Sequence, residues 1–278
     1  MRTIMRPGIG NLRLGRTRPA PSAARKVSLR DYLRSASLPT PPRSTNYSYP
    51  AAVSISRVYL NDRLGSCVVA GGCHVRGVTS ANAGGGPVLF TDADVVAMYG
   101  AIGGYDPRDP TTDRGCDEIT ALRYWQRVGF PDGVRLAGWV RVDATDPDEC
   151  RLALYLFENL FLGVELPGAW LDPAPQRDGF TWDIAGNPDP ENGHCIVAGG
   201  YDDAGLDIYT WGMLGQLTWR ALAKYATPAS GGELYALLSP DMVASAQAKA
   251  PNGLAWDALV ADLVALGGDL TPGSEVVT

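Results

Sequence analysis

The feature that most constrains this chain is a cysteine placed between a turn-forming run and a helix-forming run. Residues 61–66 read Asn-Asp-Arg-Leu-Gly-Ser, and Cys67 is followed at once by Val-Val-Ala. This order predicts a loop that delivers Cys67 to the first turn of a helix over about 67–78. Unpaired backbone N–H groups and the helix dipole lower the pKa of a thiol at that position. The stretch therefore predicts a reactive thiolate, with a buried structural cysteine as the alternative.

A histidine that could serve such a thiol as a base stands far along the chain. Gly193-His194-Cys195-Ile196-Val197 predicts a strand with His194 at its start. A turn at 202–205 and a second apolar run over 206–212 predict a hairpin partner for that strand. The sequence thus places a thiol at a helix start and an imidazole at a strand start.

The order of the predicted elements indicates an α+β fold. Helices are predicted between residues 67 and 128, and strands begin near residue 134. We therefore expect one body over 47–278, with a helical lobe at about 47–133, a β-rich lobe at about 134–240 and a C-terminal helix at about 254–267. Residues 167–190, rich in Pro, Asp and Gly, predict a long ordered loop.

The first 46 residues predict an extended basic arm. Residues 1–50 hold ten Lys and Arg residues and one acid, Asp31, although the whole chain has a net charge of −6. Prolines favour extended chain there. Such an arm can lie back on its own acidic body, which we rank first, or dock on an acidic neighbouring subunit. Nucleic-acid binding is disfavoured, because few aromatic residues interleave with the basic ones.

Composition argues against several other functions. With two histidines and no Cys-x-x-Cys pair, we expect no metal site, and the five cysteines do not form a disulfide framework. The Gly-rich run at 84–86 lacks the Lys-Ser/Thr ending of a phosphate loop, so we expect no nucleotide cofactor. The sequence shows no signal peptide or membrane-spanning run, which predicts a cytoplasmic protein, or a virion protein if it is phage-encoded.

Three short blocks together resemble the papain-like cysteine peptidases. They are Gly65-Ser66-Cys67, the strand that starts at Gly193-His194, and Thr210-Trp211-Gly212. A nearer likeness is to papain-like proteins encoded by bacteriophages and prophages, whose cysteine block reads Asn-Asp-x-x-Gly-x-Cys. The likeness spans roughly residues 47–240 in element order. It implies a two-lobe papain-like fold and a peptide or protein substrate.

The resemblance also implies a role for each matching residue. Cys67 would be the nucleophile, and His194 its base and then the acid that protonates the leaving group. Asn61 stands where the family has an oxyanion-hole glutamine, and Trp211 matches the tryptophan that shields the catalytic histidine. Gly65, Ser66 and Trp211 would line the substrate site.

The chain departs from the family at the third member of the triad. The family's Asn-Ser-Trp-Gly is Tyr209-Thr210-Trp211-Gly212 here, so the orienting asparagine is absent. Because side chains alternate along a strand, only one of Tyr209 and Thr210 can face His194. Asn192 is a further candidate for that contact, as is Asp183.

The sequence supports two hypotheses about function. The first is a thiol peptidase or amidase, with the basic arm as a pro-segment across the cleft. The second is a phage virion structural protein, associated with capsid or tail, in which a papain-like body has little or no catalytic activity. An accessible Cys–His pair favours the enzyme, and a filled cleft favours the structural role.

Overall fold

A long buried helix, α2 (Cys67–Asn82), lies at the centre of the computed structural model, which describes residues 2–6, 10–20, 27–268 and 270. Its glycines make it thin enough to pack closely on both sides. A Cβ atom added at Gly72 would lie 3.0 Å or less from three ring atoms of Trp125, and one at Gly71 would lie 2.8 Å from the ring of Phe161. The helix is therefore held between another helix and a sheet.

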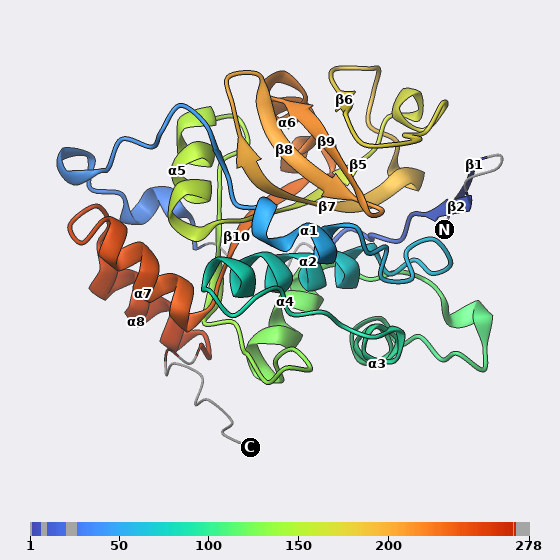
Figure 1. Cartoon of the computed structure of the whole chain (residues 1–278), viewed down its shortest axis with the longest axis horizontal. Coiled ribbons are helices and arrows are strands. Elements are labelled where there is room, and N and C mark those ends of the chain that lie inside the picture. Colours follow the sequence, from blue (N-terminus) through green and yellow to red (C-terminus); the bar gives the residue numbers. More distant parts are fainter. Residues whose placement is uncertain (1, 7–9, 21–26, 269, 271–278) are drawn as a thin grey trace.

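Helices and strands divide the molecule into two halves (Figure 1). The α-helices are α1 (Ala52–Ile55), α2, α3 (Asp92–Gly103), α4 (Glu118–Arg127), α5 (Pro147–Phe157), α6 (Trp219–Tyr225), α7 (Pro240–Lys249) and α8 (Trp256–Ala265). The strands are β1 (Thr3–Arg6), β2 (Gly10–Arg13), β3 (Thr45–Asn46), β4 (Gly138–Arg141), β5 (Leu160–Glu165), β6 (Phe180–Trp182), β7 (Gly193–Tyr201), β8 (Gly205–Thr210), β9 (Met213–Thr218) and β10 (Glu233–Leu238).

The main sheet runs in the order β4-β10-β5-β7-β8-β9-β6, with β3 paired to β7. Its pairs are antiparallel except for β6 with β9. Successive side chains of a strand point to opposite faces, and two hydrophobic cores result. Phe161, Val197 and Tyr209 face the core around α2, whereas Leu162 and Ile208 face the core that includes α5 and α6.

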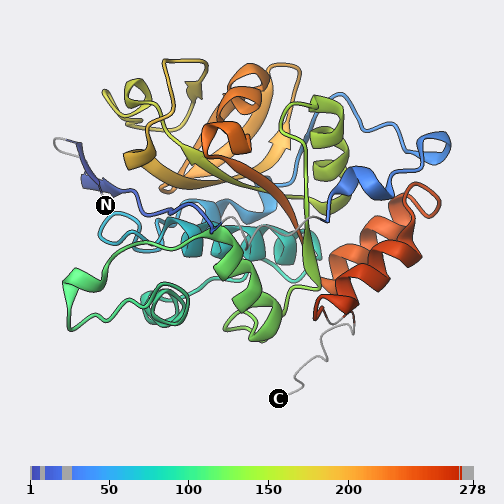
Figure 2. The ribbon, with the colours of Figure 1, turned by 180° about the vertical axis from the view of Figure 1, so that it is seen from behind.

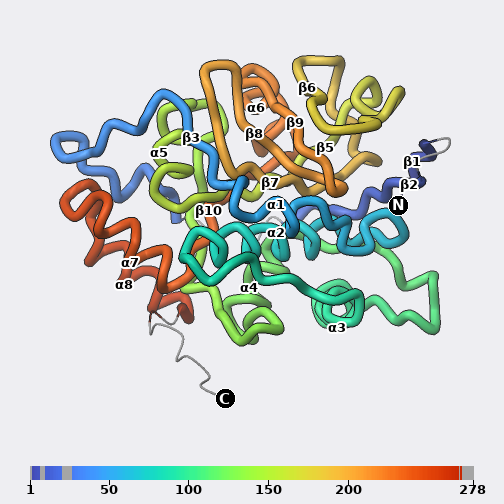
Figure 3. Tube along the Cα trace, viewed as in Figure 1, coloured from blue at the N-terminus to red at the C-terminus, as the bar shows by residue number. Residues whose placement is uncertain are grey.

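The N-terminal part of the chain passes between the two halves. From β2 the trace runs along the boundary between the helices of one half and the strands of the other, in both the front and the back view (Figures 2 and 3). Residues 29–32 then form a short 3-10 helix on the far side, against α8 and α5. This course brings the N-terminal part of the chain across the predicted site at Cys67 and His194.

Most predicted elements are present, with shifted ends. The predicted strand over 206–212 ends at Thr210, because Trp211 and Gly212 both have positive φ and form the tight turn to β9. The region 167–190 is not loop throughout, since Phe180–Trp182 pairs with β9. Strand β9 and helix α7 were not predicted. No helix in the described part of the chain is long and apolar enough to cross a membrane.

Candidate active site

Cys67 is the first residue of α2, as the sequence predicts. The loop before it is shaped by Tyr59 and Leu60, whose φ angles are 50° and 62°. The Ser66 hydroxyl donates to the carbonyl of Tyr59 and is buried, so Ser66 fixes this loop. Its place in the loop interior gives no support to the predicted contact with a substrate.

His194 is the second residue of β7 and is buried completely. Its Nε2 lies 2.6 Å from the Thr210 hydroxyl, so Thr210 is the residue that contacts the ring. The ring also stacks on Trp211, with centroids 4.1 Å apart and planes 20° apart. These two contacts fix the position and the tilt of the imidazole.

The other candidates for that contact lie elsewhere. Tyr209 points to the opposite face of β8, where its ring packs on His74 at 5.5 Å between centroids. The Asn192 amide donates to the carbonyl of Leu166, and Asp183 accepts from Thr218 and Arg220. The prediction that Tyr209, Asn192 or Asp183 could orient His194 is therefore wrong for these three residues.

The second ring nitrogen of His194 is left free. Nδ1 is buried and has no hydrogen-bond partner among the described residues, so no Cys67–His194 hydrogen bond is formed in this state. Burial lowers the pKa of His194 to about 3, because the imidazolium would lose its hydration. The imidazole is therefore neutral, with an unpaired nitrogen in an enclosed site.

The predicted low pKa of Cys67 is wrong for this state. Burial raises the pKa of the thiol to about 12, although backbone hydrogen bonds from Cys195 and Gly15 favour the thiolate. Removal of water from the charged form outweighs these hydrogen bonds. The partner Gly15 shows which part of the chain excludes the water.

Residues 10–19, named here the cleft segment, lie across the site. The Arg13 N–H donates to the carbonyl of Asn61 at 2.9 Å, and the Arg16 N–H donates to that of Gly193 at 3.1 Å. On the other wall, the Cys116 N–H donates to the Gly15 carbonyl at 3.0 Å. The segment is thus bound through its main chain to both sides, beside Cys67 and beside His194.

Gly15 sits in a slot between two further glycines. A Cβ atom on Gly15 would lie within 2.5 Å of three backbone atoms of Gly65, and a Cβ atom on Gly115 would overlap the Gly15 carbonyl. Gly65 therefore contacts a bound peptide chain, here the protein's own. The slot admits a residue without a side chain on that face.

Asn61 and Trp211 bind the same peptide carbonyl. The Asn61 amide Nδ2 donates to the Arg13 carbonyl at 3.1 Å, and the Trp211 indole Nε1 donates to it at 3.2 Å. Asn61 also donates to the carbonyl of Leu64, which fixes its side chain. The residue predicted as an oxyanion donor thus holds a carbonyl group of the cleft segment.

Arginines of the cleft segment pair with buried acids on the cleft walls. Arg13 pairs with Asp113 at 2.8 Å, and Arg18 pairs with Glu165. The Arg16 guanidinium is buried between Glu118 and Glu233. These acids were not predicted, because Glu118 in a first helical turn and Glu233 at a strand start have the pattern of ordinary surface carboxylates.

Comparisons with known proteins assign the fold. No protein-family model and no curated protein matches the chain. Solved structures that match include xylellain, a cysteine protease from Xylella fastidiosa, with a TM-score of 0.60 at 14% identity, covering 82% of this chain and 97% of that one. Procathepsin B from Trypanosoma congolense matches with a TM-score of 0.54 at 12% identity over 80% and 85% of the two chains. The proform of the ragweed pollen cysteine protease Amb a 11 matches with a TM-score of 0.52 at 15% identity over 73% and 68%.

The chain therefore has the papain-like cysteine protease fold, and the predicted α+β fold class is confirmed. Identities this low establish the fold and leave the activity to be argued from the site. The predicted likeness to phage-encoded proteins stays a prediction, since none of these relatives bears on it.

Proposed function

We propose that the protein is a thiol peptidase or amidase, present here in a latent state with the cleft segment in its substrate site. The observation that carries the proposal is the state of His194. Its ring is fixed by Thr210 and Trp211, yet Nδ1 is buried without a partner in the described chain, next to the strand residue whose backbone contacts Cys67. A buried nitrogen without a partner is costly in a purely structural site.

The reaction follows from these positions. When Nε2 carries the ring hydrogen and donates it to Thr210, Nδ1 has the lone pair that accepts a proton from the Cys67 thiol. The thiolate attacks an amide carbonyl, and the C–N bond breaks as His194 returns the proton to the amine. Water then hydrolyses the thioester, with His194 again as the base. Asn61 would donate to the carbonyl oxygen as negative charge develops on it.

Latency follows from burial. With the cleft segment bound, the thiol has a pKa of about 12 and is protonated at neutral pH. Departure of the segment would return water to Cys67, so that the helix start and His194 can favour the thiolate. Two of the matched solved structures are of proforms, namely procathepsin B and the Amb a 11 proform.

The test is hydrolysis of a denatured protein substrate and labelling by an epoxide probe in a Gly15→Ala chain, whose cleft segment we expect to open more often than in the wild type. We expect both activities, and we expect Cys67→Ala to abolish both. His194→Ala should reduce the labelling rate at neutral pH by about 100-fold or more, since a general base contributes about 10²–10⁴-fold. Labelling of Cys67 no faster than in a denatured control would contradict the proposal.

A structural role in a virion is the second candidate, and the filled cleft is the observation that favours it. In that case the cleft segment is a permanent part of the body, and Cys67 stays unreactive when the segment is loosened. The exposed part of residues 1–45 would dock on neighbouring capsid or tail subunits, so replacing its exposed Arg34 and Arg43 by Glu should abolish incorporation into particles while the body stays folded. Normal incorporation of that variant would exclude this candidate.

A further inference from the structure

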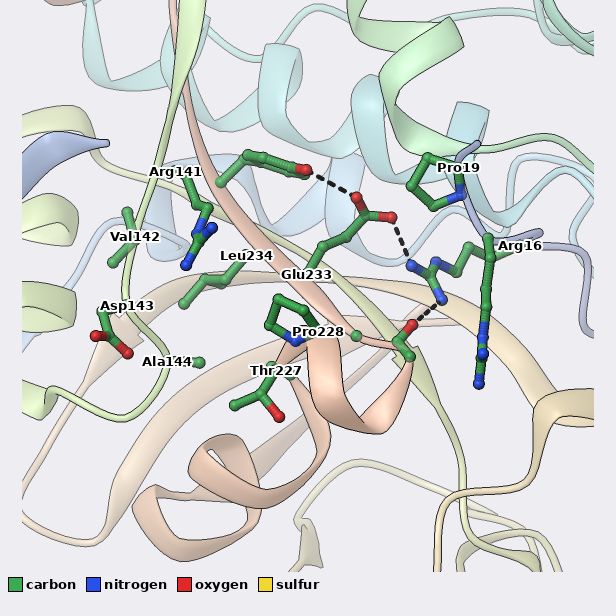
Figure 4. Close-up of a pocket in the computed structure, with 15 residues that line it drawn as sticks. Arg16, Pro19, Arg141, Val142, Asp143, Ala144, Thr227, Pro228, Glu233 and Leu234 are labelled. Carbon is green, nitrogen blue, oxygen red and sulfur yellow. Dashed lines mark hydrogen bonds and ion pairs between the residues drawn. The ribbon is translucent and has the colours of Figure 1, made fainter. Parts of the chain in front are cut away.

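The side chain of Arg16 fills a pocket in the wall of the cleft. Its Nε donates to Glu118 at 2.9 Å, its Nη2 to Glu233 at 2.5 Å and its Nη1 to the carbonyl of Gly231 at 2.7 Å. Figure 4 shows Arg16 reaching Glu233 at the edge of an adjoining cavity of about 400 Å³. Only 1% of the Arg16 side chain is exposed, so all three nitrogen atoms are satisfied inside the protein.

The pocket is shaped around a guanidinium group. Gly163 lies in the middle of β5, where glycine is unfavourable unless another group needs the space. A Cβ atom there would lie 2.5 Å from Arg16 Nε and closer still to the Glu118 carboxylate. On the far side, the Tyr235 hydroxyl donates to Glu233 at 2.8 Å and orients that carboxylate. Acceptors thus surround the three nitrogen atoms of a planar fork, a geometry that an ammonium group cannot match.

The pocket also requires a cation. Burial keeps the pKa of Glu118 well above its usual range even beside Arg16. Burial acts on Glu233 as well, but the hydrogen bond from Glu118 and the charge of Arg16 hold the pKa of Glu233 below its usual value. A carboxylate held out of water is costly when its cation is removed. An uncharged side chain of the same shape would leave the buried carboxylate without a cation, so the pocket discriminates by charge as well as by shape.

Arg16 occupies the pocket as a residue of a cleft-bound peptide. Its N–H donates to the carbonyl of Gly193, the residue before His194, and the Thr17 N–H donates to the carbonyl of Cys116 at 3.0 Å. The main chain on either side of Arg16 is therefore bound by backbone groups, which any peptide could use. The pocket itself contacts only the Arg16 side chain.

We propose that this pocket, formed by Glu118, Glu233, Tyr235, Gly163 and Gly231, is a specificity pocket that selects peptides with an arginine side chain. The inference rests on the proposed function, since it names the class of substrate for that same cleft. The cleft segment then acts as a substrate mimic, with Arg16 in the place of the substrate arginine.

Peptide binding tests the pocket without any need for catalysis. A labelled peptide with the sequence of residues 10–19 is titrated into the full chain carrying Gly15→Ala and Cys67→Ala, and fluorescence anisotropy is followed. Citrulline, the neutral isostere of arginine, replaces Arg16 in a second peptide and Arg18 in a control peptide. The Arg18 side chain also pairs with a buried acid, Glu165, but it is 58% exposed, so solvent screens that pair.

We expect citrulline at position 16 to weaken binding about 30-fold or more, the effect of losing one partner of a buried charged pair. Citrulline at position 18 should weaken it about fivefold or less, because the Arg18–Glu165 pair is partly exposed. Glu233→Gln in the protein should reduce the difference in affinity between the arginine and citrulline peptides at position 16. Equal affinity of the peptides with arginine and with citrulline at position 16 would overturn the inference. Failure of Cys67 to label would instead count against the proposed function and leave this binding result intact.

A second measurement covers the case in which the Gly15→Ala chain does not fold. Arg16→Ala removes the side chain beyond Cβ, and ethylguanidinium has the missing atoms. We expect ethylguanidinium to raise the thermal midpoint of Arg16→Ala at a concentration about tenfold lower than its neutral isostere ethylurea, and to leave the wild-type midpoint unchanged. An equal effect of the two compounds would overturn the inference.

Discussion

A single methyl group on Gly15 should open the cleft. In Gly15→Ala the new Cβ atom would lie within 2.5 Å of the carbonyl oxygen, Cα and carbonyl carbon of Gly65, closer than real Cβ contacts. These are backbone atoms of the loop that leads to Cys67, so they cannot rotate away as a flexible side chain would. The cleft segment must therefore shift instead.

The shift costs at least two hydrogen bonds. The Gly15 carbonyl loses the Cys116 N–H, and the neighbouring Arg16 N–H loses the Gly193 carbonyl. Each is worth about 0.5–1.5 kcal/mol net, so the bound state of the segment loses about 1–3 kcal/mol. Because 1.4 kcal/mol is about tenfold in an equilibrium constant, the open population should rise about 5- to 150-fold. The alkylation rate should rise equally when opening is fast compared with labelling.

The assay is native-state alkylation with iodoacetamide, mapped by mass spectrometry. All five cysteines are free and buried, so Cys73 and Cys150, which lie away from the cleft, report on unfolding while Cys67 reports on the cleft. Gly168→Ala is the matched control, since a Cβ atom there meets no atom within 4 Å. Selective, faster labelling of Cys67 in Gly15→Ala alone is the expected result. Labelling at the wild-type rate, or equal labelling of all five cysteines, would refute the reasoning.

Three further outcomes are expected. Thr210→Ala removes the contact at His194 Nε2 and should slow Cys67 labelling in the opened chain about tenfold, whereas Thr210→Ser should retain the rate; equal rates in both variants would show that the contact does not orient the ring. Gly72→Ala places a Cβ atom against the ring of Trp125 and should cost about 1–3 kcal/mol of unfolding free energy, measured by urea titration; no loss would mean that α2 can move. His74 is buried with its pKa lowered to about 3 by desolvation, so the unfolded chain binds the extra proton between about pH 6.5 and pH 3, and stability falls as pH falls through that range. His74→Phe should reduce the drop between pH 7 and pH 5 by about 2 kcal/mol, and an unchanged drop would contradict the assigned burial.

Local sequence signals were sufficient for the parts of the site that local structure builds. The polar run before Cys67 and the apolar residues after it placed the thiol at a helix start, and strand alternation limited the contact with His194 to one of two neighbours. Thr210 is that neighbour. The tight turn at Trp211 and Gly212 then brings the indole onto the imidazole. Each of these features depends on residues close together in the chain.

Long-range features could not be predicted in the same way. The glycine slot joins positions 15, 65 and 115, and the Arg16 pocket joins positions 16, 118, 163 and 233. None of these positions carries a periodic or turn-forming signal that distinguishes it from a loop glycine or a surface charge. The prediction of a low thiol pKa was wrong for the same reason, because burial under a segment distant in sequence raises the pKa of Cys67.

The geometry also explains how the cleft segment can occupy the site without being cut. Asn61 and Trp211 hold the carbonyl of Arg13, whereas the cleft-segment residue that acts on the Cys67 thiol is Gly15. The Gly15 carbonyl is itself bound by the Cys116 N–H on the opposite wall. Attack requires one carbonyl to lie against both the sulfur and the oxyanion donors, and the bound segment divides these contacts between two residues.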